Sequence, residues 1–335
     1  MKIIAFGAGR KDGNTEIYIK EALMAAEEMG LEVEYVRLRD FEIHTCGACS
    51  MQFCPAMDDP THCVYGYDDS AYLLDKFLDA DGVLIGSPVY STTGSSLFYA
   101  FRDRLFGPKV DDVMMERFGT PEWAEGRMKH RPGAIISVGG TLSKHWVSMG
   151  IPSLYSACFP PTTLVVDYMN ITGIANPGAA VLNQELLDRA HTLGENLARA
   201  TLENDTSWRG DTDMEENVCP SCHYNCVLLN PKKKDAWCAI CGIHAHISFD
   251  ENGEMVLDWP EEEQVENHLL TCGKNAHGDE IGYVLKEIYM PNKDKIPERI
   301  KKYKAYTDCE LKSPYHEAQK AKLREQYAKS KESET

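Results

Sequence analysis

The first fifteen residues, MKIIAFGAGRKDGNT, constrain the fold more than any other stretch of the chain. Lys2–Phe6 is an apolar run with the length of one buried strand, and Gly7, Gly9 and Gly13 follow it closely. The amphipathic run Glu16–Gly30 then predicts a helix. A strand, a glycine-rich turn and a helix N-terminus point backbone N–H groups at an anion, so we expect a phosphate site; an ordinary tight turn is the alternative. The turn is neither the dinucleotide fingerprint G-x-G-x-x-G nor a P-loop, because no G-K-[ST] closes it.

Strands and helices alternate through the N-terminal part of the sequence. Further apolar runs of strand length are Leu31–Leu38, Asp81–Tyr90, Pro132–Gly140 and Thr162–Met169. Helical stretches separate them, among them one around Lys144–Ala157, and residues 107–131 read as a polar excursion. This alternation predicts an α/β fold, a flavodoxin-like doubly wound five-stranded parallel sheet with strand order 2-1-3-4-5. Ligands bind such sheets at the carboxyl ends of the strands. The turns at residues 7–15, 86–94 and 139–145 fall at that edge, which strengthens the phosphate hypothesis.

Composition argues against several classes of partner. The chain carries 35 Lys and Arg against 52 Asp and Glu, and its net charge of −17 is unlike that of a nucleic-acid binder. No apolar run is long enough to span a bilayer, and no secretory signal precedes the first strand. We therefore expect a cytoplasmic protein with no nucleic-acid or membrane partner. In a reducing compartment its 12 cysteines favour metal binding or redox chemistry over disulfides.

One group of cysteines follows the second predicted strand. Cys46, Cys49, Cys54 and Cys63 have the spacing C-x2-C-x4-C-x8-C. Four thiolates so close in sequence can hold a [4Fe–4S] cluster, which is the preferred interpretation. A zinc site and a loop of reduced cysteines without metal are the alternatives.

A second group lies near residue 230. Cys219, Cys222, Cys238 and Cys241 form two C-x-x-C pairs, which together complete a tetrahedral all-sulfur metal site. Trp237–Gly242 is similar to a knuckle of rubredoxin, which binds iron, but the short separation of the pairs favours structural Zn²⁺. His244 and His246 fall on one face of a strand. Because four cysteines already satisfy the metal, we interpret that face as solvated rather than as a ligand pair.

The opening stretch resembles the G-S-x-R-x-x-G-N-T loop of the flavodoxin-like NAD(P)H-dependent FMN reductase superfamily. The tracts Ser87–Tyr90, Phe101–Phe106 and Asp68-Asp69 are also similar to that superfamily, and the cysteine loop most resembles its iron-sulfur flavoprotein branch. The resemblance covers roughly residues 1–204. Ala8 stands where the family has a serine, so one phosphate hydrogen bond must come from elsewhere.

The resemblance implies that the chain binds FMN. It places the phosphate on residues 9–15, the Pro88–Tyr90 backbone along the flavin ring, and the Gly139–Thr141 turn at the far edge of the ring. Tyr90 contacts the flavin in this interpretation and is a core aromatic in the alternative. The expected cofactor-binding residues are Gly9, Arg10, Gly13, Asn14, Thr15, Ser87, Pro88, Val89, Tyr90, Gly139, Gly140 and Thr141. No side chain is required as a nucleophile, because the cofactor carries the chemistry.

The resemblance over residues 1–204, the change in composition after Glu203 and the second group of cysteines together imply four regions. They are an FMN-binding domain over 1–204 that contains the cysteine loop 46–63, a linker over 205–217, a zinc-ribbon or rubredoxin-like module over 218–260, and a helical region over 261–335. Fold relatives often dimerise with the flavin near the interface, so the resemblance also implies a homo-oligomer, a dimer or a tetramer.

The predicted activity is that of an FMN-dependent oxidoreductase. It takes reducing equivalents from NAD(P)H or a ferredoxin-like carrier and passes them to a small electron-poor organic acceptor, such as a quinone, nitro or azo compound. The alternative is a non-catalytic electron carrier that docks with protein redox partners. Arg102, Arg104, Lys144 and His145 are candidates for binding a nucleotide phosphate or an anionic substrate, or are ordinary surface charges.

Overall fold

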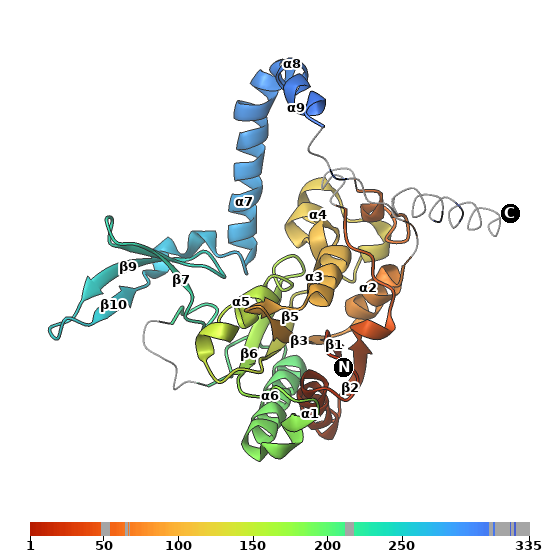
Figure 1. The fold of residues 1–335 in the computed structure, drawn as a ribbon, viewed down its shortest axis with the longest axis vertical. Helices are drawn as coiled ribbons and strands as arrows, with labels where there is room; N and C mark the ends of the chain where they lie inside the picture. Colours follow the sequence, from red (N-terminus) through yellow and green to blue (C-terminus); the bar gives the residue numbers. More distant parts are fainter. Residues whose placement is uncertain are drawn as a thin grey trace.

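A parallel sheet organises the N-terminal part of the chain (Figure 1). The computed structural model describes residues 1–47, 54–63, 66, 68–211, 218–307, 311, 322 and 325. The strand order is β2-β1-β3-β5-β6, and the two-residue strand β4 pairs antiparallel with β3. Apart from β4, this is the predicted order. The strands are β1 (Lys2–Gly7), β2 (Glu32–Arg37), β3 (Gly82–Tyr90), β4 (Thr93–Gly94), β5 (Arg131–Val138) and β6 (Thr163–Ile171).

Helices cover both faces of this sheet (Figure 1). Side chains alternate along β1, so Ile4 and Phe6 pack in one core and Ile3 and Ala5 in the other. The first core lies under α2 (Ser70–Asp79), α3 (Ser96–Phe101) and α5 (Gly150–Tyr155), and the second under α1 (Asn14–Glu28) and α6 (Gln184–Glu203). Shorter helical turns are η1 (Leu38–Asp40), η2 (Pro55–Met57), η3 (Arg102–Phe106) and η7 (Ala179–Leu182).

Two connections differ in detail from expectation. The helix expected around residues 144–157 is interrupted: η6 (Lys144–Val147) and α5 are separate. Pro152 lies in the first turn of α5, where its missing N–H costs nothing; inside one continuous helix it would break a backbone hydrogen bond. Segment 107–131, expected to be a polar excursion, buries Val110, Val113 and Ala124. It contains η4 (Gly107–Val110), α4 (Asp112–Phe118) and η5 (Glu122–Ala124).

A four-stranded antiparallel sheet forms the ribbon, residues 218–260. Its strands are β7 (Val227–Asn230), β8 (Asp235–Cys238), β9 (His244–Phe249) and β10 (Met255–Asp258), in the order β10-β9-β8-β7. Its own core holds only Ala236, Ala245 and Leu257 as buried residues. The end that carries the cysteine pairs belongs instead to the core beneath α5, where the Tyr155 hydroxyl donates to the Cys222 carbonyl at 2.8 Å.

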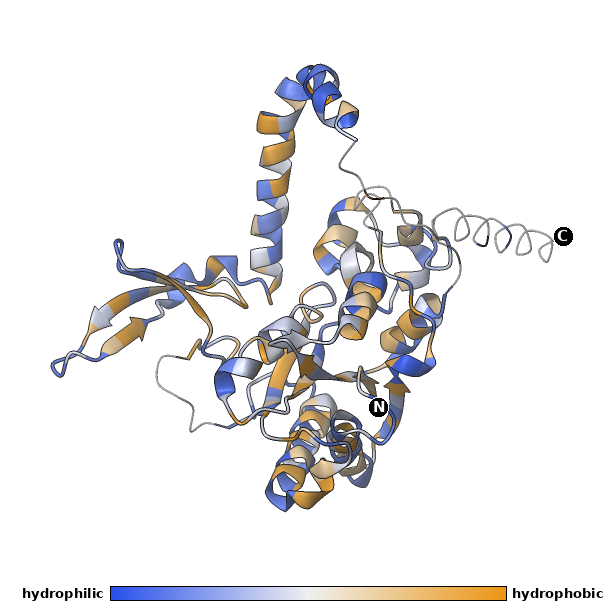
Figure 2. Cartoon of the chain, in the orientation of Figure 1, coloured by the Kyte–Doolittle hydropathy of each residue, from blue (hydrophilic) through white to orange (hydrophobic). Residues whose placement is uncertain are grey.

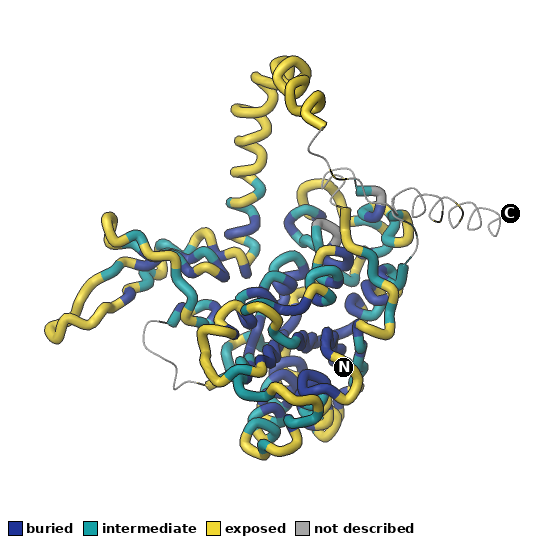
Figure 3. The backbone as a smooth tube through the Cα atoms, in the orientation of Figure 1, coloured by how far each residue is buried: buried dark blue, intermediate teal, exposed yellow. Residues whose placement is uncertain are grey.

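The chain beyond the ribbon is helical and largely exposed. It comprises η8 (Glu261–Glu266), α7 (Thr271–Tyr283), η9 (Val284–Tyr289), η10 (Met290–Lys295), α8 (Ile296–Arg299) and α9 (Lys301–Ala305). The α7 helix projects away from the sheet, and its distal end is exposed in Figure 3. Figure 2 shows apolar segments along this helical region. Its exposed apolar side chains include Ile281, Val284 and Ile288. No helix among the described residues has both the length and the apolar character needed to cross a membrane.

Candidate functional site

The turn between β1 and α1 has the geometry of an anion site. Gly13 precedes α1 and offers no side-chain cap, and the first bond inside the helix runs from the Ile17 amide to the Gly13 carbonyl at 3.0 Å. The amides from Asn14 to Glu16 precede that bond and have no acceptor among the described residues. A Cβ added to Gly9 would lie 3.0 Å from the Thr15 Cβ. The turn therefore has both the free donors and the tight backbone that a phosphate requires.

The Asn14 side chain is already engaged within the protein. Its Nδ2 donates to the carbonyls of Ile174 at 3.1 Å and Asn176 at 2.8 Å, and its Oδ1 accepts from the Ala180 amide at 3.1 Å. The side chain thus ties the turn to the loop that follows β6, and its backbone amide remains for an anion. Thr15 is buried beside Gly9. Arg10 and Gly13 lie in the same turn, Arg10 exposed and Gly13 buried.

A buried carboxylate lies in the first turn of α1. Glu16 accepts two hydrogen bonds from Arg37, at 2.8 Å each, and its other partner is Lys20 at 2.6 Å. The Arg37 hydrogen bonds lower the pKa of Glu16 to about 2, although burial opposes that shift. Because two cations neutralise it, Glu16 can remain ionised next to an anion site.

A second hollow, which we call the ring pocket, lies between the loops that follow β3 and β5. Pro88 pairs with Val138 and Gly7 with Gly86, so these loops leave the same sheet edge as the anion turn. A Cβ on Gly139 would lie 2.1 Å from Val147 Cγ1, so glycine alone fits there without a shift. The pocket has a volume of about 380 Å³ and is lined by Val89, Ser91, Thr92, Gly139, Gly140, Thr141, Trp146 and Val147.

The ring pocket includes two residues of the predicted 86–94 turn, Ser91 and Thr92, that the sequence did not single out as site residues. Ser91 and Thr92 connect β3 to β4 with φ values of 50° and 74°. Two consecutive positive φ values define the tight hairpin turn that normally takes Asn-Gly, so a Ser-Thr pair gives no sequence signal for it. Such strain in a β-branched residue is typical of functional sites. Tyr90, just before this turn, is 62% exposed and is therefore not a core aromatic.

Ser87 and Pro88 shape the start of the same loop. The buried Ser87 hydroxyl accepts from the Ser95 amide at 3.0 Å and donates to the Pro88 carbonyl at 2.9 Å. The Ser87 side chain thus holds the turn together from inside the protein.

A larger cavity, the aromatic pocket, lies between the end of β6 and the ribbon. Its volume is about 550 Å³. The Tyr168 ring lies 5.3 Å from that of Trp208 and 5.7 Å from that of Tyr224, and the Tyr224 hydroxyl donates to the Ser148 carbonyl at 3.0 Å. Asn170 donates to the Tyr224 hydroxyl at 3.3 Å, while its buried Oδ1 has no hydrogen-bond partner among the described residues. The segment 139–148 borders both pockets, because Lys144, His145 and Ser148 line the aromatic one.

The four cationic residues that the sequence offers for binding an anionic ligand differ in where they lie. Arg104 is buried and donates to Asp68 at 2.7 Å; burial lowers its pKa, but the hydrogen bond to Asp68 leaves it raised overall. Arg102 donates to Asp103 and to Ser156. Lys144 and His145 are exposed at the aromatic pocket, so they are the two candidates placed to meet a ligand.

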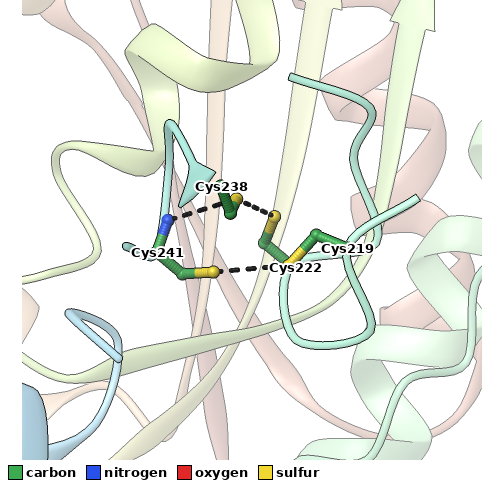
Figure 4. Close-up of side chains that lie close together, drawn as sticks. All are labelled: Cys219, Cys222, Cys238 and Cys241. Carbon is green, nitrogen blue, oxygen red and sulfur yellow. Dashed lines mark hydrogen bonds between the residues drawn. The ribbon is translucent and has the colours of Figure 1, made fainter. Parts of the chain in front are cut away.

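The four-cysteine group, Cys219, Cys222, Cys238 and Cys241, is assembled as predicted (Figure 4). All four side chains are buried, and their sulfurs lie within 4.8 Å of one another. The Cys219–Cys241 and Cys222–Cys238 sulfur separations are 3.3 and 3.5 Å. The Ile240 and Cys241 amides point at the Cys238 sulfur, at 3.4 and 3.5 Å. Four buried sulfurs with N–H donors fit a closed tetrahedral metal site.

The cysteines of the cysteine loop, residues 46–63, are not gathered in the same way as the four-cysteine group in the part of the chain that the structure describes. Cys49 lies outside the described residues. Cys46 is exposed and Cys54 and Cys63 are half-buried, and none of them belongs to a potential metal-binding group formed within the described ranges. The [4Fe–4S] cluster at this loop therefore stays a prediction.

Comparisons with known proteins extend these observations. Residues 1–150 match the family described as NADPH-dependent FMN reductase. A flavone synthase of Aspergillus candidus is 27% identical over 288 residues, covering 83% of this chain and 87% of that protein. An iron-sulfur flavoprotein of Methanocaldococcus jannaschii is 36% identical over 109 residues, which is 31% of this chain and 51% of the relative. A solved structure of a flavone reductase, 27% identical, superposes with a TM-score of 0.73 and covers 93% of this chain and 100% of the other.

Proposed function

We propose that this chain, whose residues 1–150 match the NADPH-dependent FMN reductase family, is an FMN-dependent oxidoreductase that acts on a planar aromatic enone of the flavone type. The observation that carries this proposal is the likeness to a flavone reductase over 93% of the chain, which includes the ribbon beside the aromatic pocket. One of the two relatives that match most of the chain is named for forming a flavone and the other for reducing one, and a single site can serve both directions.

The cofactor residues follow from the geometry of the two smaller sites. In this proposal the amides of Asn14–Glu16 and the Thr15 hydroxyl bind the FMN phosphate, which compensates for Ala8. The ring pocket holds the flavin between the Ser91-Thr92 turn and the Gly139–Thr141 turn. Bound FMN supplies hydride chemistry, so the protein must position, desolvate and polarise the acceptor.

The aromatic pocket suits a flat, partly polar acceptor. Tyr168, Trp208 and Tyr224 offer ring faces and edges against which fused aromatic rings pack. Reduction of an enone adds hydride to the carbon β to the ketone and a proton to the α carbon. Lys144 and His145 can donate to the ketone oxygen, where negative charge develops. The unpartnered Asn170 Oδ1 can accept from a phenolic hydroxyl.

The test is anaerobic turnover of the purified protein. We expect bound flavin with absorption near roughly 375 and 450 nm, bleaching by NADH or NADPH, and re-oxidation by a flavone with formation of a product two mass units heavier. If NAD(P)H reduces the flavin and a quinone re-oxidises it but flavones do not, the assignment of a flavone-type acceptor is wrong. Bleaching by reduced ferredoxin alone, without turnover of any organic acceptor, would favour the electron-carrier alternative.

Two variants separate cofactor binding from general packing. Thr15→Val removes one hydroxyl at the phosphate turn and is expected to weaken FMN binding roughly tenfold, as loss of one charge-assisted hydrogen bond does. Thr201→Val is the matched control, because Thr201 is also a buried helical threonine, bonded to the Leu197 carbonyl in α6. Equal FMN affinity in both variants would contradict the phosphate assignment.

The proposed role of Asn170 in binding the acceptor is tested with two substrates, a flavone with hydroxyl groups and the same flavone without them. Asn170→Leu is expected to raise KM for a hydroxylated flavone by about tenfold or more, because the phenol loses its acceptor. KM for the same flavone without hydroxyls serves as the internal control and is expected to change little. An equal change in KM for both compounds would show that Asn170 does not bind a phenolic hydroxyl.

Three further proposals concern groups and partners. We propose Zn²⁺ in the four-cysteine group, with rubredoxin-type iron as the alternative, and [4Fe–4S] at Cys46, Cys49, Cys54 and Cys63. Analysis of zinc, iron and acid-labile sulfide in anaerobically purified protein distinguishes these cases. We also propose a homo-oligomer, which light scattering measures directly.

A further inference from the structure

A second set of metal-ligand side chains lies on the ribbon, away from the four-cysteine group. We propose that Asp235, His244 and His246 bind a divalent transition-metal ion of the Zn²⁺ class, with Glu263 orienting both histidines. This site does not depend on the proposed redox function. It replaces the solvated histidine face expected from the sequence.

Strand register brings the three residues to one face. In the β8–β9 pairing Asp235 lies opposite His246, and Trp237 lies opposite His244. Side chains alternate along each strand, so these four share one face, while Ala236 and Ala245 are buried on the other. The hairpin thus gathers a carboxylate and two imidazoles from positions that are not adjacent in the sequence.

The separations suit ligands around one ion. Asp235 Oδ1 lies 3.6 Å from His244 Nε2 and 3.6 Å from His246 Nδ1, and the three ligand atoms are all within 4.8 Å of one another. At 3.6 Å these pairs are too far apart for hydrogen bonds. Ligands about 2.0–2.1 Å from a tetrahedral ion lie about 3.4 Å apart, so each of the two pairs that Asp235 makes with a histidine needs only a small contraction.

Glu263, from η8, holds the opposite sides of both rings. Its Oε1 lies 2.9 Å from His246 Nε2, and its Oε2 pairs with His244 Nδ1. A metal-binding histidine usually donates its second ring N–H to a carboxylate, a backbone carbonyl or water, and a carboxylate there orients the ring and makes the ligand nitrogen more basic. The two carboxylates also match the charge of a divalent cation.

The site is open, in contrast to the four-cysteine group. The His246 side chain is 47% exposed and that of Asp235 is 19% exposed, so three protein ligands leave a position that solvent can reach. We expect an exchangeable ion whose occupancy follows the free metal concentration. Because Glu263 belongs to η8, the ion also fixes the segment that connects the ribbon to α7.

The experiment counts metal equivalents in the full-length protein. Protein that carries one tightly held zinc per chain is titrated with Zn²⁺ by calorimetry, and with Co²⁺ by visible absorption. We expect one further equivalent per chain. We expect His244→Gln and His246→Gln to abolish it, and Glu263→Gln to retain it with affinity lowered about 10- to 100-fold.

A matched control tests whether any histidine between carboxylates suffices. His191 lies 3.2 Å from Glu21 and 3.5 Å from Glu28 but belongs to no ligand group among the described residues, so His191→Gln is expected to leave the second equivalent intact. Trp237 supplies a local signal, because its ring lies 5.1 Å from that of His244. We expect metal-dependent fluorescence that Trp237→Phe removes.

Two results would overturn the proposal. One is that the unaltered protein binds no metal beyond the one zinc per chain that it carries before the titration. The other is a second equivalent that survives in His246→Gln, which would place that ion elsewhere. His246 is the most exposed ligand, so this variant decides the question even if His244→Gln fails to fold.

Discussion

The chain contains two groups of four cysteines, and their surroundings differ. Cys219, Cys222, Cys238 and Cys241 are at most 2% exposed and face one another. In the cysteine loop Cys46 is exposed, and Cys54 and Cys63 are half-buried. A C-x-x-C pair brings two sulfurs together within one turn, whereas gaps of four and eight residues leave the approach of the sulfurs to tertiary packing. The spacing of the cysteines, rather than their number, therefore decides whether the sequence alone can predict that their sulfurs meet.

The two groups are also attached to the protein differently. The four-cysteine group is joined to the main core through Tyr155, which donates to the Cys222 carbonyl. The cysteine loop is anchored at its base by Asp68, which accepts from the His44 amide at 3.0 Å and from Arg104 at 2.7 Å. One group is packed into the main core, and the other is attached to the protein through a buried ion pair.

The largest expected effect separates the two groups directly. Cys222→Ala removes a ligand from a ribbon whose own core is very small, and we expect loss of the metal and of more than about 4 kcal/mol of unfolding free energy. Cys46→Ala alters an exposed side chain and is expected to change that free energy by less than about 0.5 kcal/mol. Denaturant unfolding with zinc analysis checks both. Similar unfolding free energies in the two variants would contradict the conclusion that the two cysteine groups differ in their contribution to stability.

The second effect concerns the anchor of the cysteine loop. Asp68→Asn leaves the Arg104 charge buried without its counter-ion, and we expect a loss of about 3–5 kcal/mol in unfolding free energy. Asp79→Asn is the control: it breaks an ion pair with Arg127 in which the Asp79 side chain is 54% exposed, which is worth less than about 1 kcal/mol. If the two variants lose equal stability, the loop does not depend on the buried pair.

A smaller effect tests the attachment of the ribbon to the core. Tyr155→Phe leaves the Cys222 carbonyl without the phenol, and we expect a loss of about 1–2 kcal/mol in thermal or denaturant unfolding. Tyr72→Phe, which alters an exposed tyrosine on α2, is expected to have no measurable effect. An unchanged unfolding free energy in Tyr155→Phe would mean that this hydrogen bond does not help to hold the ribbon on the core.

The smallest expected effect is the contribution of Asp68 to the pH dependence of the unfolding free energy. Burial raises its pKa, but hydrogen bonds from Arg104 and Ser70 leave the folded pKa below the ordinary value of 3.8. The unfolded state then binds the proton more tightly, so this contribution is complete above that value and is lost as pH falls through the folded pKa. Unfolding free energy measured between neutral pH and acid should fall less in Asp68→Asn than in the unaltered protein. An equal fall in both would contradict the assignment.

The sequence by itself determined the features that depend on neighbouring residues. The central strands, the glycine turn before α1 and the four-cysteine group follow from hydrophobic period, turn chemistry and C-x-x-C spacing, and the structure has all of them. These signals are local, because each element's pattern lies within a short stretch of the chain.

Only the tertiary structure decided which distant side chains meet. It directs Asn14 to the loop after β6, pairs Arg104 with Asp68, and joins Lys144 and Tyr224 in one pocket. It also divides the helix expected at 144–157 and brings Asp235 opposite His246. These contacts depend on register and packing between elements far apart in sequence, and a pattern within one segment carries no information about its partner across the fold.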